Sequence, residues 1–321
     1  MTDVAKAAQC DASTVSLALR DDPRITEATR NRIKKIAAEM NYSVNPLIAA
    51  WVHARRASLS PPQHIPIAYL ACHPPGFDWK QSIHFSTIYE GARSQLENHG
   101  FKLSVFELHE YERDFKRLNE VLQARNIQGI IVGPSTHHYR IEGFDWSKYA
   151  AAAIGYALDD PLLHRVSEDH YKGMKQLFEH CLHKGYRRIG LGIVRTHNDE
   201  RYQRWLAAYL LEQHLSDLEP KLPIFQAQSD DWKEPALAWA REQKPNIVLT
   251  DDPDEWKDLN IPTMGFAISD FDHSDSQGII ENNREIGIGA ADVIVGLLYR
   301  NERGAPHCRR TVLVDPEEGF V

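Results

Sequence analysis

Four side chains near the N-terminus are of types that can read a nucleic acid. Ser13, Thr14, Ser16 and Leu17 fall on the outer face of a helix expected over residues 12–19. Short hydroxyl groups allow a close approach of the backbone, and they donate and accept hydrogen bonds at phosphate oxygens and base edges. Leu17 adds an apolar group that suits a thymine methyl. The pattern alone also fits a small helical subdomain with a solvated Ser/Thr face.

Three short helices would hold this face in place. Thr2 and Asp3 start a helix over residues 2–8, Asp11 can cap the helix over residues 12–19, and Thr26 can cap a third. Apolar residues recur at helical spacing on one side of each helix. We therefore expect residues 1–44 to form one unit around a small core, built from Val4, Ala5, Ala8, Val15, Ala18, Leu19, Ile33, Ile36, Ala37 and Met40.

The next segment reads as a hinge. Asn45 followed by Pro46 is a helix start signal, and it predicts a short helix over residues 47–56. The Ser- and Pro-rich residues 58–62 then form a linker. We assign residues 45–62 to a hinge helix and linker.

From Ile65 onward, short apolar runs alternate with amphipathic segments of helix length, which is typical of βαβ units around a parallel sheet. Two series of such units predict two Rossmann-like α/β lobes with a cleft between them. The first lobe is expected at about residues 63–157 and 281–309, and the second at about 158–280 and 310–321. Strands are expected at residues 65–70, 103–106, 129–132, 150–155, 188–193, near 224, 247–250, 264–266 and 310–314.

Charge and hydropathy bound the class of protein. The net charge is −8, but residues 1–60 hold nine Lys or Arg and six Asp or Glu, so a mildly basic head precedes an acidic body. No apolar run approaches the roughly 20 residues that cross a bilayer, and the first ten residues lack a signal-peptide pattern. We expect a cytoplasmic protein without a membrane partner. The four cysteines are far apart and are expected to be reduced packing residues.

Several motifs in the head closely resemble the DNA-binding headpiece of the LacI/GalR family. They are the segments at residues 3–8, 13–20, 23–30 and 37–42. Looser similarity continues through residues 85–92, 129–131, 166–173, 185–190 and 285–292. The resemblance implies an all-α helix-turn-helix headpiece joined to a bilobed α/β core of the type I periplasmic-binding-protein fold, used as a homodimer.

The resemblance also implies roles in DNA binding. Thr14 and Ser16 correspond to recognition-helix residues, and base-reading positions fall on Ala12, Ser13 and Leu17. Contacts to the DNA backbone are implied for Arg24, Thr26, Thr29, Tyr42 and Asn45.

The hinge departs from the family pattern at one position. Trp51 stands where family members carry a leucine that wedges into the minor groove. An indole could wedge there too, or the hinge helix could pack on the core. Both interpretations stay open.

The effector site departs from the family pattern as well. The family's sugar-binding arginine and aspartate correspond to Trp205 and Ala267. An ordinary monosaccharide site is therefore in doubt, and either aromatic stacking on a sugar ring or an apolar effector becomes the hypothesis. Candidate lining residues, each of which could equally be core packing, are Phe85, Tyr89, Arg201, Arg204, Trp205 and Asp251.

Catalysis finds little support in the sequence. The histidines lack partners at metal or triad spacing, and no hydrolase, zinc-protease or Walker motif occurs. Gly190-Leu191-Gly192 is a weak dinucleotide signal that fits a strand end better, and the acidic run at residues 251–254 fits a solvated loop better than a cation site. We expect no enzyme activity, cofactor or metal.

The expected function is sequence-specific transcriptional regulation, with repression favoured. The expected partners are a pseudo-palindromic double-stranded DNA operator and a small carbohydrate effector that modulates operator affinity. The alternative is a ligand-binding sensor module that no longer reads DNA.

Overall fold

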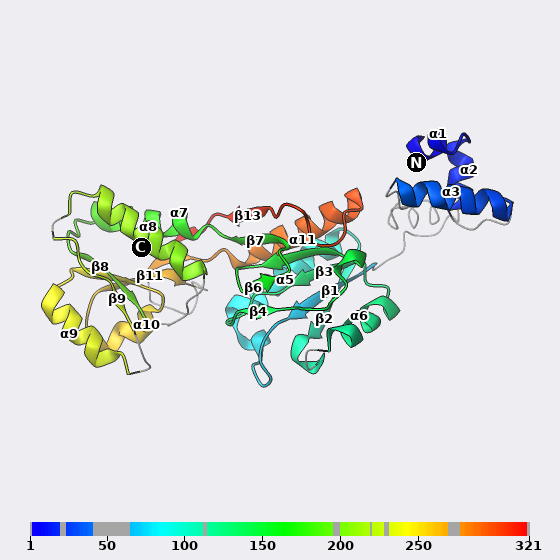
Figure 1. The fold of residues 1–321 in the computed structure, drawn as a ribbon. Coiled ribbons are helices and arrows are strands. Elements are labelled where there is room, and N and C mark those ends of the chain that lie inside the picture. The colour runs from blue at the N-terminus through cyan, green and yellow to red at the C-terminus, as the bar shows by residue number, and fades with distance from the viewer. Residues whose placement is uncertain are drawn as a thin grey trace. The chain divides into compact units, whose positions relative to one another are not determined.

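The computed structural model describes residues 2–19, 24–40, 65–111, 114–194, 200–218, 220–227, 231–268 and 277–319. The chain forms an N-terminal unit within residues 1–63 and a core unit that begins at residue 64 (Figure 1). The expected hinge helix and linker at residues 45–62 lie outside the described residues, as do Tyr42, Asn45 and Trp51. None of the described helices is long and apolar enough to span a membrane.

The N-terminal unit contains the three expected helices, α1 (Thr2–Ala7), α2 (Ala12–Ala18) and α3 (Glu27–Glu39). Their apolar sides meet in one small core, whose fully buried members are Val4, Ala5, Ala8, Val15, Ala18, Ile33 and Ala37. The expectation that Met40 joins this core is wrong, because its side chain is 43% exposed. The reason is that α3 ends at Glu39 and Met40 is its C-cap, beyond the last helical turn.

The first sheet of the core is six-stranded, and all its pairings are parallel. Its spatial order is β13 (Thr311–Val314), β7 (His164–Glu168), β5 (Ala150–Ile154), β3 (Gly129–Val132), β1 (Ile65–Ala71) and β2 (Phe101–Glu107). The helices of this part of the chain are α5 (Ile83–Asn98), α6 (Phe115–Ala124) and α11 (Asn283–Arg300). Strand β3 is buried along its whole length, as expected for a central strand covered on both faces.

The second sheet is also six-stranded. Its order is β14 (Glu317–Gly319), β12 (Gly278–Ile280), β11 (Thr263–Ile268), β10 (Ile247–Thr250), β8 (Ile189–Ile193) and β9 (Phe225–Gln226), and only β14 is antiparallel to its neighbour. Its helices are α7 (His170–His183), α8 (Glu200–Leu215), α9 (Lys233–Gln243) and α10 (Pro253–Trp256). The expected bilobed α/β core is therefore confirmed.

Smaller elements complete the core. A two-stranded sheet pairs β4 (Tyr139–Arg140) with β6 (Leu158–Asp160). Single 3-10 turns are η1 (Trp79–Gln81), η2 (Leu108–Tyr111), η3 (Trp146–Lys148) and η4 (Lys257–Leu259).

The border between the lobes differs from the expected one. Strands β7 and β13 pair with each other in the first sheet, although the sequence analysis assigned residues 158–280 and 310–321 to the second lobe. The chain therefore crosses between the lobes three times, in the connections β7–α7, β12–α11 and β13–β14. A hydropathy pattern does not predict β7, because its sequence, His-Arg-Val-Ser-Glu, is mostly polar. The strand is buried because it pairs with β5 and β13.

The paired glycines of β8 lie within the strand and have a packing role. A Cβ atom on Gly192 would overlap ring carbons of Trp256, and one on Gly190 would lie 2.7 Å from Cη2 of Trp239. The absence of a side chain at these positions allows the tryptophan rings to pack closely against the strand. The weak dinucleotide interpretation is not needed to explain them.

Candidate DNA-binding and effector sites

The connection between α1 and α2 is a tight turn. The amide of Cys10 donates to the carbonyl of Ala5 at 3.0 Å, and Gln9 adopts a left-handed backbone conformation with φ 48°. Asp11 then takes the N-cap position of α2 in an extended conformation, although its side chain makes no capping hydrogen bond. This turn joins α1 and α2 as a helix-turn-helix.

Helix α2 buries one side and leaves another available. Val15 and Ala18 are fully buried against α1 and α3, whereas Thr14 and Leu17, one turn apart, are only half-buried. The side chains of Ala12, Ser13 and Ser16 lie outside the described residues. Of the expected base-reading face, the structure therefore places Thr14 and Leu17 together at the partly accessible side of α2.

Three residues expected to contact the DNA backbone gather at the start of α3. The hydroxyl of Thr26 accepts from the amide of Thr29 at 3.4 Å and donates to the hydroxyl of Thr29 at 2.9 Å. Arg24 precedes this cap and is exposed. A helix N-terminus carries free amide donors and a positive dipole end, so this group suits a phosphate.

The core contains a cavity of about 490 Å³ that residues of both lobes line. Three of the expected effector residues, Phe85, Trp205 and Asp251, lie in its wall together with Ala267. Sequence reasoning missed other residues that line it, namely Phe77, Gln81, His84, Ser135, Tyr202 and Glu281. Most of these residues lie in loops or near the ends of helices and strands, and no local sequence pattern indicates which of those positions face the cleft.

The other expected effector residues lie elsewhere or are not described. Tyr89 does not line the cavity and packs edge-on against Tyr69 and Trp79, with ring centroids 5.2 and 5.4 Å apart. Arg204 is exposed, and its guanidinium lies 4.4 Å from the ring centroid of Tyr156. The side chain of Arg201 lies outside the described residues.

Aromatic rings make one wall of this cavity. Trp205 is 2% exposed, and its ring contacts those of His170, Phe266 and Tyr202 at centroid distances of 4.6, 4.8 and 5.4 Å. Such a cluster holds the indole in one orientation. A rigid indole can present its edge or face to a ligand at little cost in conformational entropy.

Buried acidic groups provide the polar part of the wall. A carboxylate oxygen of Asp251 accepts from the amide of Val194 at 3.1 Å and from the hydroxyl of Thr250 at 3.3 Å. Glu281 pairs with Nδ1 of His84 at 2.9 Å. Carboxylates accept hydrogen bonds only, so together with the rings they suit a ligand with hydroxyl donors and an apolar face.

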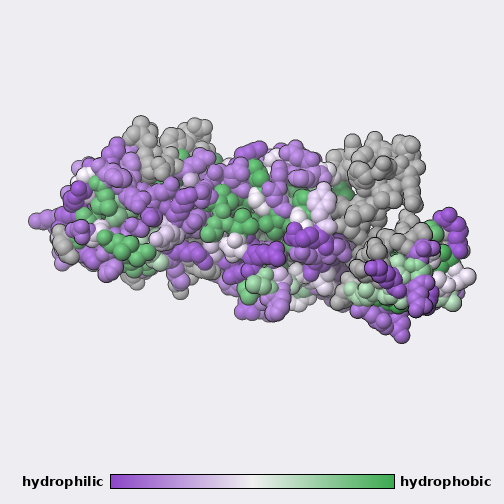
Figure 2. Space-filling view, turned by 90° about the horizontal axis from the view of Figure 1, so that it is seen from above, coloured by the Kyte–Doolittle hydropathy of each residue, from purple (hydrophilic) through white to green (hydrophobic). Residues whose placement is uncertain are grey.

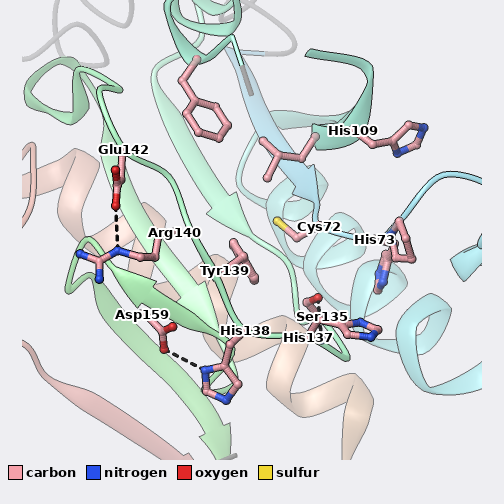
Figure 3. Close-up of a pocket in the computed structure, with 13 residues that line it drawn as sticks. Cys72, His73, His109, Ser135, His137, His138, Tyr139, Arg140, Glu142 and Asp159 are labelled. Carbon is pink, nitrogen blue, oxygen red and sulfur yellow. Dashed lines mark hydrogen bonds and ion pairs between the residues drawn. The ribbon is translucent and has the colours of Figure 1, made fainter. Parts of the chain in front are cut away.

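A larger and more open cavity, of about 1040 Å³, lies in the first lobe where β1, β2 and β3 end (Figure 3). Its histidines come from different loops, and His138 pairs with Asp159 at 2.8 Å. Burial, together with the nearby His84 and His137, lowers the pKa of His73 to about 4. Burial also raises the pKa of the Cys72 thiol to about 12, which keeps it protonated and a poor nucleophile.

Comparison with known proteins agrees with both halves of this arrangement. The model of the lacI family of bacterial regulatory proteins matches residues 1–45. No curated protein sequence matches the chain.

Solved structures match the chain along its length. The transcriptional regulator CelR in complex with cellobiose is 14% identical, with a TM-score of 0.55 over 98% of this chain and 96% of that one. The lac repressor dimer bound to operator and the anti-inducer ONPF is 14% identical, with a TM-score of 0.55 over 99% and 97%. The transcription regulator CcpA of Lactococcus lactis is 11% identical, with a TM-score of 0.57 over 81% and 100%.

At these identities the solved structures establish the fold, and the family match establishes the nature of the head. The helix-turn-helix unit and the bilobed core are the two parts that such regulators combine. Residues 1–45 therefore match the lacI family of bacterial regulatory proteins, and the core that follows has the fold of the solved CelR and lac repressor structures.

Proposed function

We propose that this protein is a transcriptional repressor whose affinity for a DNA operator changes when a sugar or sugar derivative binds between the core lobes. The observation that carries the proposal is a helix-turn-helix unit on the same chain as a core with a ligand-sized cavity lined by both lobes. The structurally similar CelR–cellobiose complex and the lac repressor dimer bound to operator and ONPF support it.

The proposed mechanism couples two equilibria. A homodimer presents two α2 helices to successive major grooves of a pseudo-palindromic operator, and phosphates are held near Arg24, Thr26 and Thr29. A ligand that contacts both lobes favours one arrangement of the core. The resulting change in operator affinity is reciprocal, so operator DNA changes ligand affinity by the same factor.

The cavity suggests how a sugar would be held without the family's aspartate. Ala267 offers no acceptor, and we assign that role to the buried carboxylate of Asp251. Trp205 and Phe85 would pack against the apolar face of the ring. The effector is thus bound by stacking and by acceptor groups that recognise vicinal hydroxyls.

The homodimer is supported by an apolar surface on the first lobe. Val312 and Leu313 on the edge strand β13 are 42% and 46% exposed. Figure 2 shows hydrophobic residues gathered near the middle of the core, where β13 runs in Figure 1. An exposed apolar edge strand is a surface that a second copy can cover.

Operator binding is tested by fluorescence anisotropy of the full-length protein on its own upstream DNA. Replacing Thr14 and Ser16 with Ala removes two hydrogen-bonding groups, each worth about 0.5–1.5 kcal/mol, so affinity should fall roughly 5- to 150-fold. The exposed α3 substitution Asn31→Ala is the matched control and should bind as the unaltered protein does. If the unaltered protein forms no specific complex while circular dichroism shows intact helices, the sensor module that no longer reads DNA becomes the better description.

Effector binding is tested by thermal shift with a panel of sugars that includes cellobiose. Trp205→Phe and Asp251→Asn should each reduce the shift, because each removes a group from the cavity wall. Trp239→Phe removes a half-buried indole that does not line this cavity and serves as the control. Equal shifts in all three variants would show that the ligand binds elsewhere.

A further inference from the structure

The connections between the lobes bring together three buried side chains that can bind a metal ion. Glu168 ends β7, His170 begins α7, and Glu281 directly follows β12. One potential ligand atom from each lies within 4.8 Å of the others. Their exposed fractions are 2%, 3% and 7%. The group therefore joins two of the three points at which the chain crosses between the lobes.

A small cavity lies at this cluster. Its volume is about 40 Å³, and Glu168, His170, Glu281 and His84 all line it. A water molecule occupies roughly 30 Å³ in the liquid, so the space fits an ion with a single water and excludes a sugar. The sugar-sized cavity of about 490 Å³ is lined by Glu281 and His84 but not by Glu168 or His170.

The donor set selects a class of ion. One imidazole nitrogen and two carboxylates suit Zn²⁺ or Mn²⁺, whereas Mg²⁺ and Ca²⁺ prefer oxygen ligands alone. His84, whose Nδ1 lies 2.9 Å from Oε2 of Glu281, would orient that carboxylate as metal-site neighbours do.

We propose that the core binds one divalent transition-metal ion, best matched by Zn²⁺, through Glu168, His170 and Glu281. The ion ties the β7–α7 connection to the β12–α11 connection and so favours one arrangement of the lobes. The rival explanation is a metal-free network of charges. Guanidinium groups are close by, because those of Arg165 and Arg204 each lie 4.4 Å from the ring centroid of Tyr156, which lines the same cavity.

The test uses full-length protein without an affinity tag, treated with EDTA and then titrated with ZnCl₂ by calorimetry. We expect one tight site per chain. Glu281→Gln and His170→Asn should abolish it, and His84→Ala should weaken it roughly 10- to 100-fold, as loss of a supporting group does. The control replaces His137 and His138 with Gln, which removes two imidazoles from the open first-lobe cavity and should leave the tight site unchanged.

Two results would overturn the proposal. One is zinc binding by the unaltered protein that is no tighter than that of Glu281→Gln, which favours the metal-free network. The other is loss of the tight site in the His137/His138 variant. Should His170→Asn misfold by circular dichroism, titration of the unaltered protein with CoCl₂ decides. Visible bands from nitrogen and oxygen ligands support the site, whereas a thiolate charge-transfer band or no bands at all contradict it.

Discussion

The smallness of the N-terminal core predicts that one substitution can separate the two activities of this protein. Ile33 is completely buried and is the largest side chain among the fully buried residues of that core, four of which are alanines. Truncation to Ala at such a site costs about 2–5 kcal/mol, whereas Ile→Val costs about 0.5–1.5 kcal/mol. A unit of about 40 residues is stabilised by only roughly 2–6 kcal/mol.

The two ranges overlap, so Ile33→Ala should leave the head folded in about half of the chains. A dimer that needs both heads then retains about a quarter of its operator affinity, because apparent affinity scales with the competent fraction. A further 1 kcal/mol of destabilisation reduces each folded fraction to about a sixth, and affinity falls roughly 40-fold. Ile33→Val should change operator affinity less than twofold.

The assay measures operator affinity by anisotropy and core stability by tryptophan fluorescence. No tryptophan lies in residues 1–40, and six of the seven lie after residue 64, so the fluorescence reports on the core. Ile33→Ala should leave core melting and effector binding unchanged, and the exposed control Met40→Ala should alter neither activity. The reasoning is refuted if Ile33→Ala binds operator normally at 37 °C, or if the core melts earlier in that variant.

Three further predictions concern the core. Gly192→Ala should lower the free energy of unfolding by about 1–3 kcal/mol, because the added Cβ would overlap the fully buried Trp256. Gly190→Ala should lower it less, because the added Cβ would meet the half-buried Trp239. Urea denaturation of both variants measures the difference. Folding lowers the pKa of His73 from 6.5 to about 4, so the unfolded chain binds more protons than the folded chain between these pH values. The free energy of unfolding should therefore decrease as the pH falls from 6.5 to 4. His73→Gln should flatten this pH dependence. Cys308 is exposed and should react first with a thiol reagent at pH 8, ahead of Cys72 and Cys181, whose pKa values burial raises to about 12; equal rates would contradict their burial.

The sequence determined the secondary elements wherever local signals were strong. The helix start at Thr26, the short apolar strand at residues 129–132 and the helix expected over residues 12–19 all lie within a residue or two of their expected positions. These elements depend on capping, periodicity and runs of apolar residues, which are properties of neighbouring residues. Local sequence motifs of the same kind also indicated the resemblance of residues 1–44 to a known family.

Only the tertiary structure decided how the lobes divide and which residues meet. Strand β7 is polar in sequence and is buried because β5 and β13 flank it, and the short β12 forms only beside β11 and β14. Tyr89 and Trp205 are both aromatic residues on helices, yet only Trp205 reaches the cavity. Glu168, which ends β7 of the first sheet, and Glu281, which follows β12 of the second, come together because both lie where the chain crosses between the lobes. No local pattern records that pairing, since it results from the burial that the assembled sheets provide.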